Sequence, residues 1–268
     1  MSARLLRELR LFLVALQFLT RVPIPKWVGF EPEWLHASAR HFPAVGACVG
    51  LLSAGVLWGA SAVFPPAVAA ALSMLSSVVL TGAFHDDGLA DTCDALGGVV
   101  SRERALQIMK DSRIGTYGAV GLLMVLGLKA AVLAALPLGL AMSALVLGHT
   151  VSRAAAVALM HWLPYAGDPD QAKAKPLAHH VSSAGLLVAC GWGLAVAAAL
   201  RLQCMASDPG LGAAMAAAVL AAVGCAHWWH RRLGGFTGDT LGATQQLTEL
   251  CMLLATLASL RMTPWSAA

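Results

Sequence analysis

The feature that most constrains this fold is a set of long apolar runs without charge. Several stretches of about 20 residues carry no charged side chain, and a helix of that length crosses the hydrocarbon core of a bilayer. Hydrophobic residues make up 58% of the 268 residues and charged residues 12%, about half the usual charged share of a soluble domain. We therefore predict an all-α, polytopic membrane protein built as a helical bundle.

The apolar runs predict about seven transmembrane helices. Pro65-Pro66 and Pro137 mark tight turns between paired helices, because proline cannot continue a preceding helix. The last span is the least regular, since it contains Glu249. The expected spans are 44–64, 66–84, 115–136, 138–160, 183–205, 211–230 and 242–260.

The N-terminal segment has a different pattern. Residues 5–20 place arginines between leucines at short intervals, which predicts an amphipathic helix lying in the membrane interface. We expect a single transmembrane catalytic domain over 1–268, with an interfacial segment at 1–40 and the membrane bundle at about 44–260.

The lysines and arginines predict the orientation. With a cytoplasmic N-terminus and seven helices, fifteen of the 18, Arg153 included, fall on the cytoplasmic side. Arg201 and Arg261 fall on the other side and Lys129 lies within a span. The net charge of +4 is then an orientation signal that requires no nucleic-acid partner. The segments placed on the cytoplasmic side are 85–94, 102–113, 161–182 and 234–243.

The stretch FHDDGLADTCDALGG (84–98) holds four of the 14 acidic residues. On a helix, Asp87, Asp91 and Asp94 project within about 60° of each other. Carboxylates this close repel one another unless a cation neutralises them, and oxygen ligands favour Mg²⁺. We expect a magnesium site here, with Asp86, about 100° from Asp87, in a supporting position.

A plainer interpretation is a solvated acidic loop in which Asp86 or Asp87 is a helix N-cap. It explains one or two carboxylates but not the others at helical spacing. Gly88 would let a backbone or a substrate come close. His85 either orients a carboxylate or acts as a base, or it is simply a histidine beside the helix.

A basic stretch follows in SRERALQIMKDSRIGTYGA (101–119). Lys110 and Arg113 have the charge and reach to bind phosphate oxygens, although they could be ordinary basic residues of a cytoplasmic loop. Gly115 and Gly118 free the backbone at the next helix start, whose N–H groups could hold an anion. Carboxylates for Mg²⁺ followed by phosphate-binding cations are typical of phosphoryl transfer.

A second polar segment, GGFTGDTLGATQQLTEL (234–250), contains two carboxylates. Asp239 lies at a glycine-rich helix start and is either a site residue or an N-cap. Glu249 lies inside an apolar run, where a carboxylate is costly. It has either a functional role or a structural ion pair with Arg153 or Lys129.

Three ordered motifs, HDDGLADTCDALGG, IMKDSRIGTYGA and GGFTGDTLGA, resemble signatures of the cobalamin synthase (adenosylcobinamide-GDP ribazoletransferase) family. QFLTRVPIP and ARHFPAVGACVG fit the same family, so the resemblance covers nearly the whole chain. It implies a Mg²⁺-dependent, multi-pass enzyme of the inner membrane. Such an enzyme joins adenosylcobinamide-GDP to α-ribazole or its 5′-phosphate and releases GMP.

The resemblance also implies roles for individual residues. One or two Mg²⁺ would sit on the substrate pyrophosphate, Asp94 or His85 would deprotonate the ribazole hydroxyl, and the basic residues would neutralise phosphate oxygens. The expected metal ligands are Asp87, Asp91, Asp94 and Asp239 from the resemblance, together with Asp86, an added carboxylate that departs from the family pattern. The expected catalytic residues are His85, Asp94, Lys110 and Arg113. The expected substrate contacts are Gly88, Asp111 and Glu249.

Two other functions remain open at this point. A CDP-alcohol phosphotransferase of lipid synthesis uses clustered aspartates in the same chemistry, but it has an arginine where this chain has Asp91. An ion transporter would place carboxylates near the bilayer midplane, often in two related halves. The sequence also leaves open whether the chain forms a homo-oligomer.

Overall fold

The computed structural model describes residues 3–29, 31–167, 179–204 and 209–262. Over these residues the protein is helical apart from connecting turns and one isolated bridge between Tyr165 and Phe236, which confirms the predicted all-α class. The α-helices are α1 (Ala3–Leu19), α2 (Pro32–Ser38), α3 (Phe42–Ser61), α4 (Pro66–Thr81), α5 (Phe84–Leu96), α6 (Arg102–Ile108), α7 (Thr116–Ala135), α8 (Leu138–Trp162), α9 (Ser183–Cys204), α10 (Pro209–Leu233) and α11 (Gly238–Met262).

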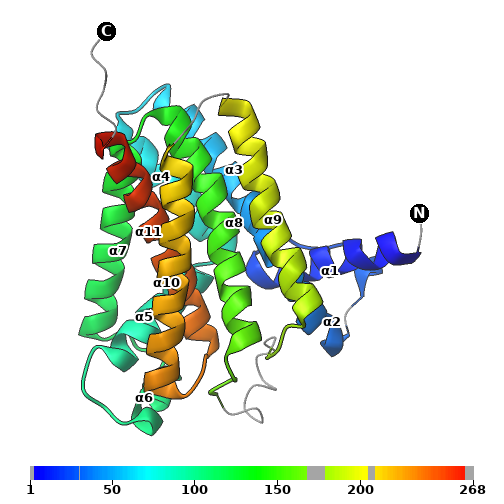
Figure 1. Ribbon diagram of the computed structural model, residues 1–268. Helices are drawn as coiled ribbons and strands as arrows, with labels where there is room; N and C mark the ends of the chain where they lie inside the picture. The colour runs from blue at the N-terminus through cyan, green and yellow to red at the C-terminus, as the bar shows by residue number, and fades with distance from the viewer. Residues whose placement is uncertain (1–2, 30, 168–178, 205–208, 263–268) are drawn as a thin grey trace.

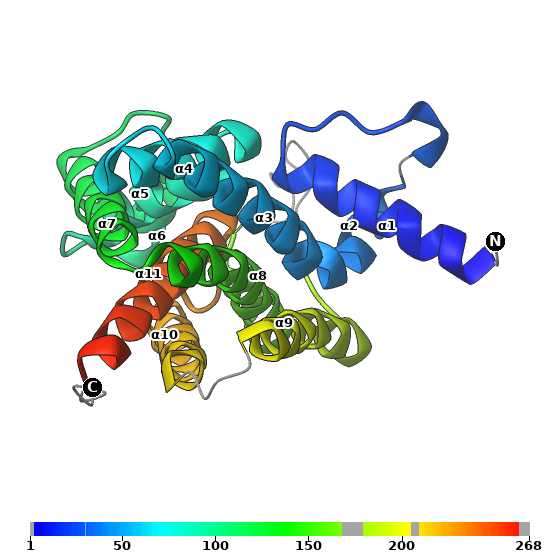
Figure 2. The ribbon, with the colours of Figure 1, turned by 90° about the horizontal axis from the view of Figure 1, so that it is seen from above.

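The long helices form a bundle around α8 (Figure 1). In α8, 78% of the most apolar window is buried, against 22% or less in α7, α9 and α10, so α8 is the core helix. Seen from above, α3, α9, α10 and α11 surround it (Figure 2). Pro66 opens α4 and Pro137 precedes α8, as predicted, since proline is well tolerated at helix starts.

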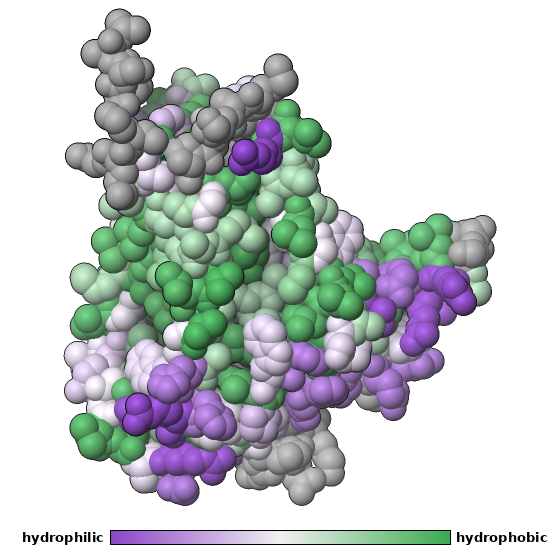
Figure 3. All heavy atoms as spheres, viewed as in Figure 1, coloured by the Kyte–Doolittle hydropathy of each residue, from purple (hydrophilic) through white to green (hydrophobic). Residues whose placement is uncertain are grey.

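The flank of the bundle is apolar, and hydrophilic side chains gather at its lower end (Figure 3). Five helical segments are long and apolar enough to cross a membrane, and the bent pair α4–α5 would make a sixth, among the residues described. The sequence predicted seven. The difference is α11, whose buried side includes several polar residues that lower its hydropathy.

Helix α1 is amphipathic, as predicted, and runs crosswise to the long helices (Figure 1). Its buried side chains include Leu11 and Val14, while Glu8 on its partly exposed side contacts Arg40 and His41 at 3.4 and 2.9 Å. A crosswise amphipathic helix has the direction expected of a segment in the membrane interface.

The described parts of the segments that the sequence predicted to share one side of the membrane meet at one end of the bundle (Figure 1). Residues 168–178 of the predicted 161–182 segment lie outside the described residues. Arg102 Nε donates to the Leu233 carbonyl at 2.6 Å, and its Nη2 donates to the Ala166 carbonyl at 3.2 Å. Arg232 donates to the Gly98 carbonyl at 3.3 Å. These bonds tie α6 and the end of α5 to the two later connections.

Candidate active site

A sharp corner places the acidic helix α5 at this end of the bundle. Gly82 and Ala83 both adopt left-handed backbone angles, with φ of 68° and 58°, and α4 and α5 meet at 92°. A Cβ on Gly82 would lie 2.5 Å from Arg21 Nε, and the Arg21 amide donates to the Leu80 carbonyl at 2.8 Å. The position therefore requires glycine, and the end of α1 braces the corner.

Helix α5 has two chemically different sides. Asp87 is exposed and Asp91 is partly buried, whereas His85 and Asp86 are buried at 6% and 8% exposure. The N-cap of α5 is Ala83, so neither Asp86 nor Asp87 caps the helix, and the plainer interpretation of the motif does not hold. The predicted acidic face exists on a helix, and Asp86 lies off it.

Asp94 is held by the start of α7. Its carboxylate oxygens accept the Gly115 and Gly118 amides at 2.6 and 2.8 Å. A Cβ on either glycine would clash with the Asp94 carboxylate. The predicted anion-binding helix start is therefore present, and the anion that it holds is a side chain of the same protein. The expected metal and base roles of Asp94 stay predictions.

Helices α5 and α11 cross at very close range. A Cβ on Gly88 would lie 2.8 Å from the Asp239 carbonyl oxygen, and one on Gly242 would lie 3.3 Å from Gly88 Cα. The sequence predicted that Gly88 lets either a backbone or a substrate come close. In the structure the backbone of α11 takes this position. The crossing brings Asp239, in the first turn of α11, beside the acidic helix.

The start of α11 is capped by threonines. The Thr240 amide donates to Thr237 Oγ1 at 3.2 Å, and the Thr237 amide donates to Thr240 Oγ1 at 2.8 Å. This reciprocal arrangement is a capping box. Asp239 is therefore not the N-cap of α11, which removes the structural alternative proposed for it.

The basic segment after α5 is largely exposed. Lys110 and Arg113 lie at the surface, and Arg113 pairs with Asp111 at 2.6 Å. The hydrogen bonds from Arg113 hold the pKa of the Asp111 carboxyl at about 2. Of the three residues, Arg113 and Asp111 neutralise each other in this structure.

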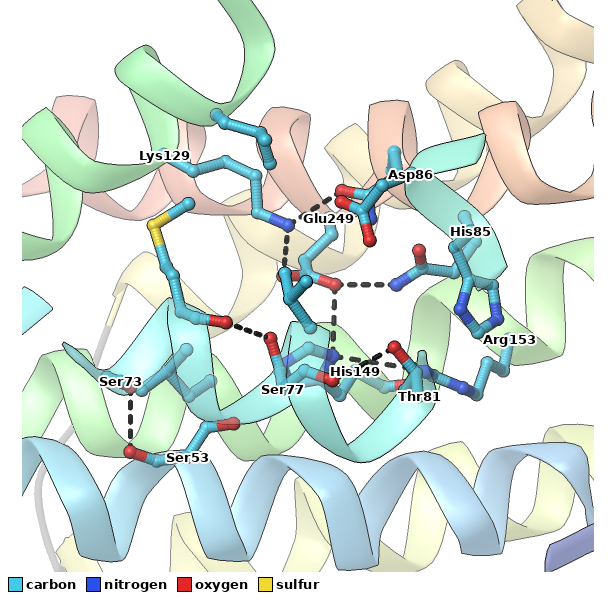
Figure 4. A pocket seen from close by; sticks show the side chains of 16 residues that line it. Ser53, Ser73, Ser77, Thr81, His85, Asp86, Lys129, His149, Arg153 and Glu249 are labelled. Carbon is cyan, nitrogen blue, oxygen red and sulfur yellow. Dashed lines mark hydrogen bonds and ion pairs between the residues drawn. The ribbon is translucent and has the colours of Figure 1, made fainter. Parts of the chain in front are cut away.

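Behind the acidic face, six polar side chains from four helices form a continuous chain of contacts inside the bundle, the buried network (Figure 4). Gln246 donates to Asp86 at 3.0 Å and accepts from Lys129 at 2.9 Å. Lys129 contacts Glu249 at 2.6 Å, and Glu249 contacts His149 at 3.1 Å. The chain ends with Arg153, whose Nη1 donates to the His149 carbonyl at 2.9 Å.

A small cavity of about 20 Å³ adjoins the buried network. Three buried polar atoms of its lining residues have no protein partner among the described residues: Ser53 Oγ, Arg153 Nε and Gln245 Oε1. Such a cavity holds about one water molecule, and polar partners of this kind are what an internal water requires.

The buried network contains the residues that the sequence reasoning placed least well. Glu249, expected to contact substrate, is 2% exposed and pairs with Lys129, one of the two partners named for it. Arg153, counted with the cytoplasmic cations, is 2% exposed inside α8. His149 and Gln246 were missed, although polar residues within apolar runs are a signal for such a network. His85, expected as a base, lines the cavity of this region.

The acidic face has the donor chemistry for Mg²⁺. Among the described residues, no group of three or more histidine, cysteine or acidic side chains is arranged to hold a metal ion. Mg²⁺ is usually bound by one or two carboxylates together with substrate phosphates and waters, and not by a complete protein cage. Asp87 and Asp91 on α5 supply two such carboxylates, and Asp239 lies at the start of the helix that crosses α5.

Comparisons with known proteins agree on one family. The family model described as cobalamin-5-phosphate synthase matches residues 11–257. A protein of Leptothrix cholodnii named adenosylcobinamide-GDP ribazoletransferase is 58% identical over 260 residues, covering 96% of this chain and 98% of its own. Proteins of the same name from Shewanella woodyi and Polaromonas naphthalenivorans are 43% and 42% identical, covering 92% and 96% of this chain and 95% and 100% of their own.

No solved structure matches the chain significantly. The family model nevertheless covers the chain from the middle of α1 to near the end of α11, including the acidic face and the buried network. The chain therefore belongs to the cobalamin-5-phosphate synthase family.

Proposed function

We propose that this protein is an adenosylcobinamide-GDP ribazoletransferase. The observation that carries the proposal is the 58% identity to a protein of that name across nearly the full length of both chains. This identity favours the ribazoletransferase over the two alternatives, a CDP-alcohol phosphotransferase and an ion transporter. The substrates would be adenosylcobinamide-GDP and α-ribazole or its 5′-phosphate, and the second product would be GMP.

The acidic face is the part of the protein suited to this reaction. Asp87, Asp91 and Asp239 would hold Mg²⁺, which neutralises the pyrophosphate of the nucleotide when bound. Lys110 lies in the exposed segment that follows α5 and can bind the remaining phosphate oxygens. Arg113 can do the same after it exchanges Asp111 for a phosphate.

The chemical step is a displacement at phosphorus. The ribazole hydroxyl oxygen bonds to the cobinamide-side phosphorus, and the bond from that phosphorus to the bridging oxygen breaks, so that GMP leaves with the electron pair. The hydroxyl proton passes to a carboxylate on the acidic face. Asp94 shares the side of α5 that carries Asp87 and Asp91, whereas His85 lines the cavity on the inner side of α5. We therefore favour Asp94 over His85 as the proton acceptor.

We further propose that the end carrying α5 and α6 faces the cytoplasm and that the bundle spans the inner membrane. Exposed arginines at this end, among them Arg102, Arg104 and Arg231, support this orientation, because cytoplasmic loops carry an excess of basic residues. Nucleotide substrates are then bound on the side of the membrane where they are made.

The test is GMP release by purified protein given adenosylcobinamide-GDP, α-ribazole and Mg²⁺. Wild type should release GMP only when ribazole is present, and Asp91→Asn should lower the rate at least about 10²-fold. Glu103→Gln, which removes an exposed carboxylate of α6 away from the acidic face, is the matched control and should keep the rate. Folded wild type that releases no GMP would refute the transferase, and an active Asp91→Asn would refute the metal site.

A further inference from the structure

We propose that Asp86 is a positioning residue, through which the buried network fixes the rotation of α5 so that Asp87 and Asp91 face the substrate. The inference rests on the proposed function and deepens it, because it separates two adjacent aspartates that the sequence assigned to one metal site. Asp86 acts from behind the site and does not touch the metal.

The first argument is the direction of the two side chains. Neighbouring residues on an α-helix project about 100° apart, so Asp86 and Asp87 cannot both face the same ion. Asp86 is 8% exposed and accepts a hydrogen bond from Gln246 at 3.0 Å inside the bundle, whereas Asp87 is exposed. Figure 4 shows Asp86 directed toward Lys129 and Glu249.

The second argument is the packing of α5 on α11. The two helices meet through Gly88 and Gly242, which carry no side chains that could interlock. Such a contact admits only the glycine side of α5, because a Cβ at Gly88 would lie 2.8 Å from the Asp239 carbonyl oxygen. A buried polar contact across the same interface, from Asp86 to Gln246, specifies the rotation, because turning α5 would leave both groups without a partner.

The third argument is that the charged side chains of the network hold one another in place. Six helices line the cavity beside the network, and four of them contribute its titratable groups: Asp86 and His85 from α5, Lys129 from α7, His149 and Arg153 from α8, and Glu249 from α11. The other two, α3 and α4, line it with serines, Thr81 and apolar side chains. With neutral histidines the two carboxylates balance the two cations. Removing Lys129 or Glu249, which are paired directly at 2.6 Å, leaves the other charge buried and uncompensated, so the arrangement resists change.

The fourth argument comes from the corner before α5. Gly82 and Ala83 join α4 to α5 through two left-handed residues and not through a continuous helix. The register of α4 therefore does not by itself fix which side of α5 faces the bundle. The tie from Asp86 to the network supplies that information.

The experiment measures Mn²⁺ binding, with Mn²⁺ in place of Mg²⁺, by electron paramagnetic resonance on the full-length protein in detergent. Wild type and Asp86→Asn, which keeps an oxygen for Gln246, should bind with dissociation constants within threefold of each other, and Asp87→Asn should bind at least tenfold more weakly. Asp86→Leu should also bind at least tenfold more weakly, because it releases α5. Asp86→Asn is then the conservative rescue of Asp86→Leu.

Two variants on α11 complete the design. Gln246→Leu removes the partner of Asp86 at a buried position two helical turns beyond Asp239 and should weaken Mn²⁺ binding as Asp86→Leu does, which keeps the test decisive if Asp86→Leu fails to fold. Thr248→Val, at a fully buried hydroxyl whose oxygen has no partner among the described residues, is the matched control and should leave binding unchanged.

Three results would overturn the proposal. Asp86→Asn binding as weakly as Asp87→Asn would make Asp86 a metal ligand. Folded Asp86→Leu and Gln246→Leu binding like wild type would show that the network does not position α5. Wild type binding no Mn²⁺ would remove the site that the network is meant to orient. GMP release measured on the same samples separates this inference from the transferase, because Mn²⁺ binding does not require turnover.

Discussion

Two ion pairs in this protein have the same length and opposite surroundings. Lys129 and Glu249 lie 2.6 Å apart with side chains 6% and 2% exposed, and Arg113 and Asp111 lie 2.6 Å apart with side chains 87% and 38% exposed. Water competes with the second pair and solvates either partner when the pair opens. The first pair has no such alternative. Distance alone therefore says little about what an ion pair does.

The difference assigns the two pairs to different tasks. The buried pair belongs to a network in which each member depends on its neighbours, so it specifies how four helices are rotated. The exposed pair opens at low cost, which suits an arginine that must exchange a carboxylate for a phosphate. The buried Lys129–Glu249 pair fixes the arrangement of the helices behind the acidic face. The exposed Arg113–Asp111 pair keeps an arginine in front of that face that can exchange its partner.

The largest expected effect is on the buried pair. Lys129→Met leaves Glu249 buried without its cation, and we expect the free energy of unfolding to fall by about 3–5 kcal/mol. Thermal unfolding of purified protein in detergent measures the loss. The double variant Lys129→Met/Glu249→Leu should recover a large part of it, since no charge is left unpaired. A double variant less stable than the single one would break the comparison.

A smaller loss is expected where α5 and α11 cross. Gly88→Ala puts a methyl group 2.8 Å from the Asp239 carbonyl oxygen, which is backbone and cannot move away cheaply. We expect about 1–3 kcal/mol of destabilisation, as for other overpacked contacts, with weaker Mn²⁺ binding. Gly127→Ala, on an outward face of α7 with open space around its Cα, is the control. Equal stability of the two variants would contradict the close crossing.

The next effect concerns the cap that Asp94, on α5, provides for the start of α7. Asp94→Ala leaves the Gly115 and Gly118 amides without their acceptor, and loss of such a cap costs about 1 kcal/mol. Asp94→Asn keeps one acceptor oxygen and should lose less stability. Unfolding measurements give the order wild type, Asp94→Asn, Asp94→Ala. If the two variants were equally stable, the cap would contribute nothing.

The smallest effect is expected at the exposed pair. Asp111→Asn should leave the melting temperature unchanged near neutral pH, because both partners are solvated in either state. The pKa of Asp111 is lowered to about 2 in the folded protein, so any stabilisation from its charge is present above the unfolded-state value and is lost as pH falls toward 2. Melting curves of wild type and Asp111→Asn from pH 7 down to 3 test this. A lower melting temperature of the variant at neutral pH would show that Asp111 contributes more to stability than expected.

The sequence predicted the parts of this structure that depend on local pattern. Periodicity located the amphipathic α1, and helical spacing placed Asp87 and Asp91 on one side of α5. The prolines marked the starts of α4 and α8. The distribution of basic residues grouped the segments that Arg102 and Arg232 now tie together. Each of these features follows from residues close together in the chain.

What the sequence could not supply depends on the relative rotation of helices. The partner of Asp94 is a helix start that looked like a phosphate site, and the partner of Asp86 lies on a helix far along the chain. The corner at Gly82 and Ala83 involves a left-handed alanine, which no propensity favours. The membrane span count differed at α11, whose polar residues lower its hydropathy.

The long-range ties of the acidic helix also set an order of events during synthesis. Arg102 is bound to carbonyls 64 and 131 positions later, and Asp86 to an amide 160 positions later. A ribosome that has just completed α5 has therefore made Asp87, Asp91 and Asp94 but neither Asp239 nor any of these later partners. We therefore expect a chain that ends before α11 to be inactive.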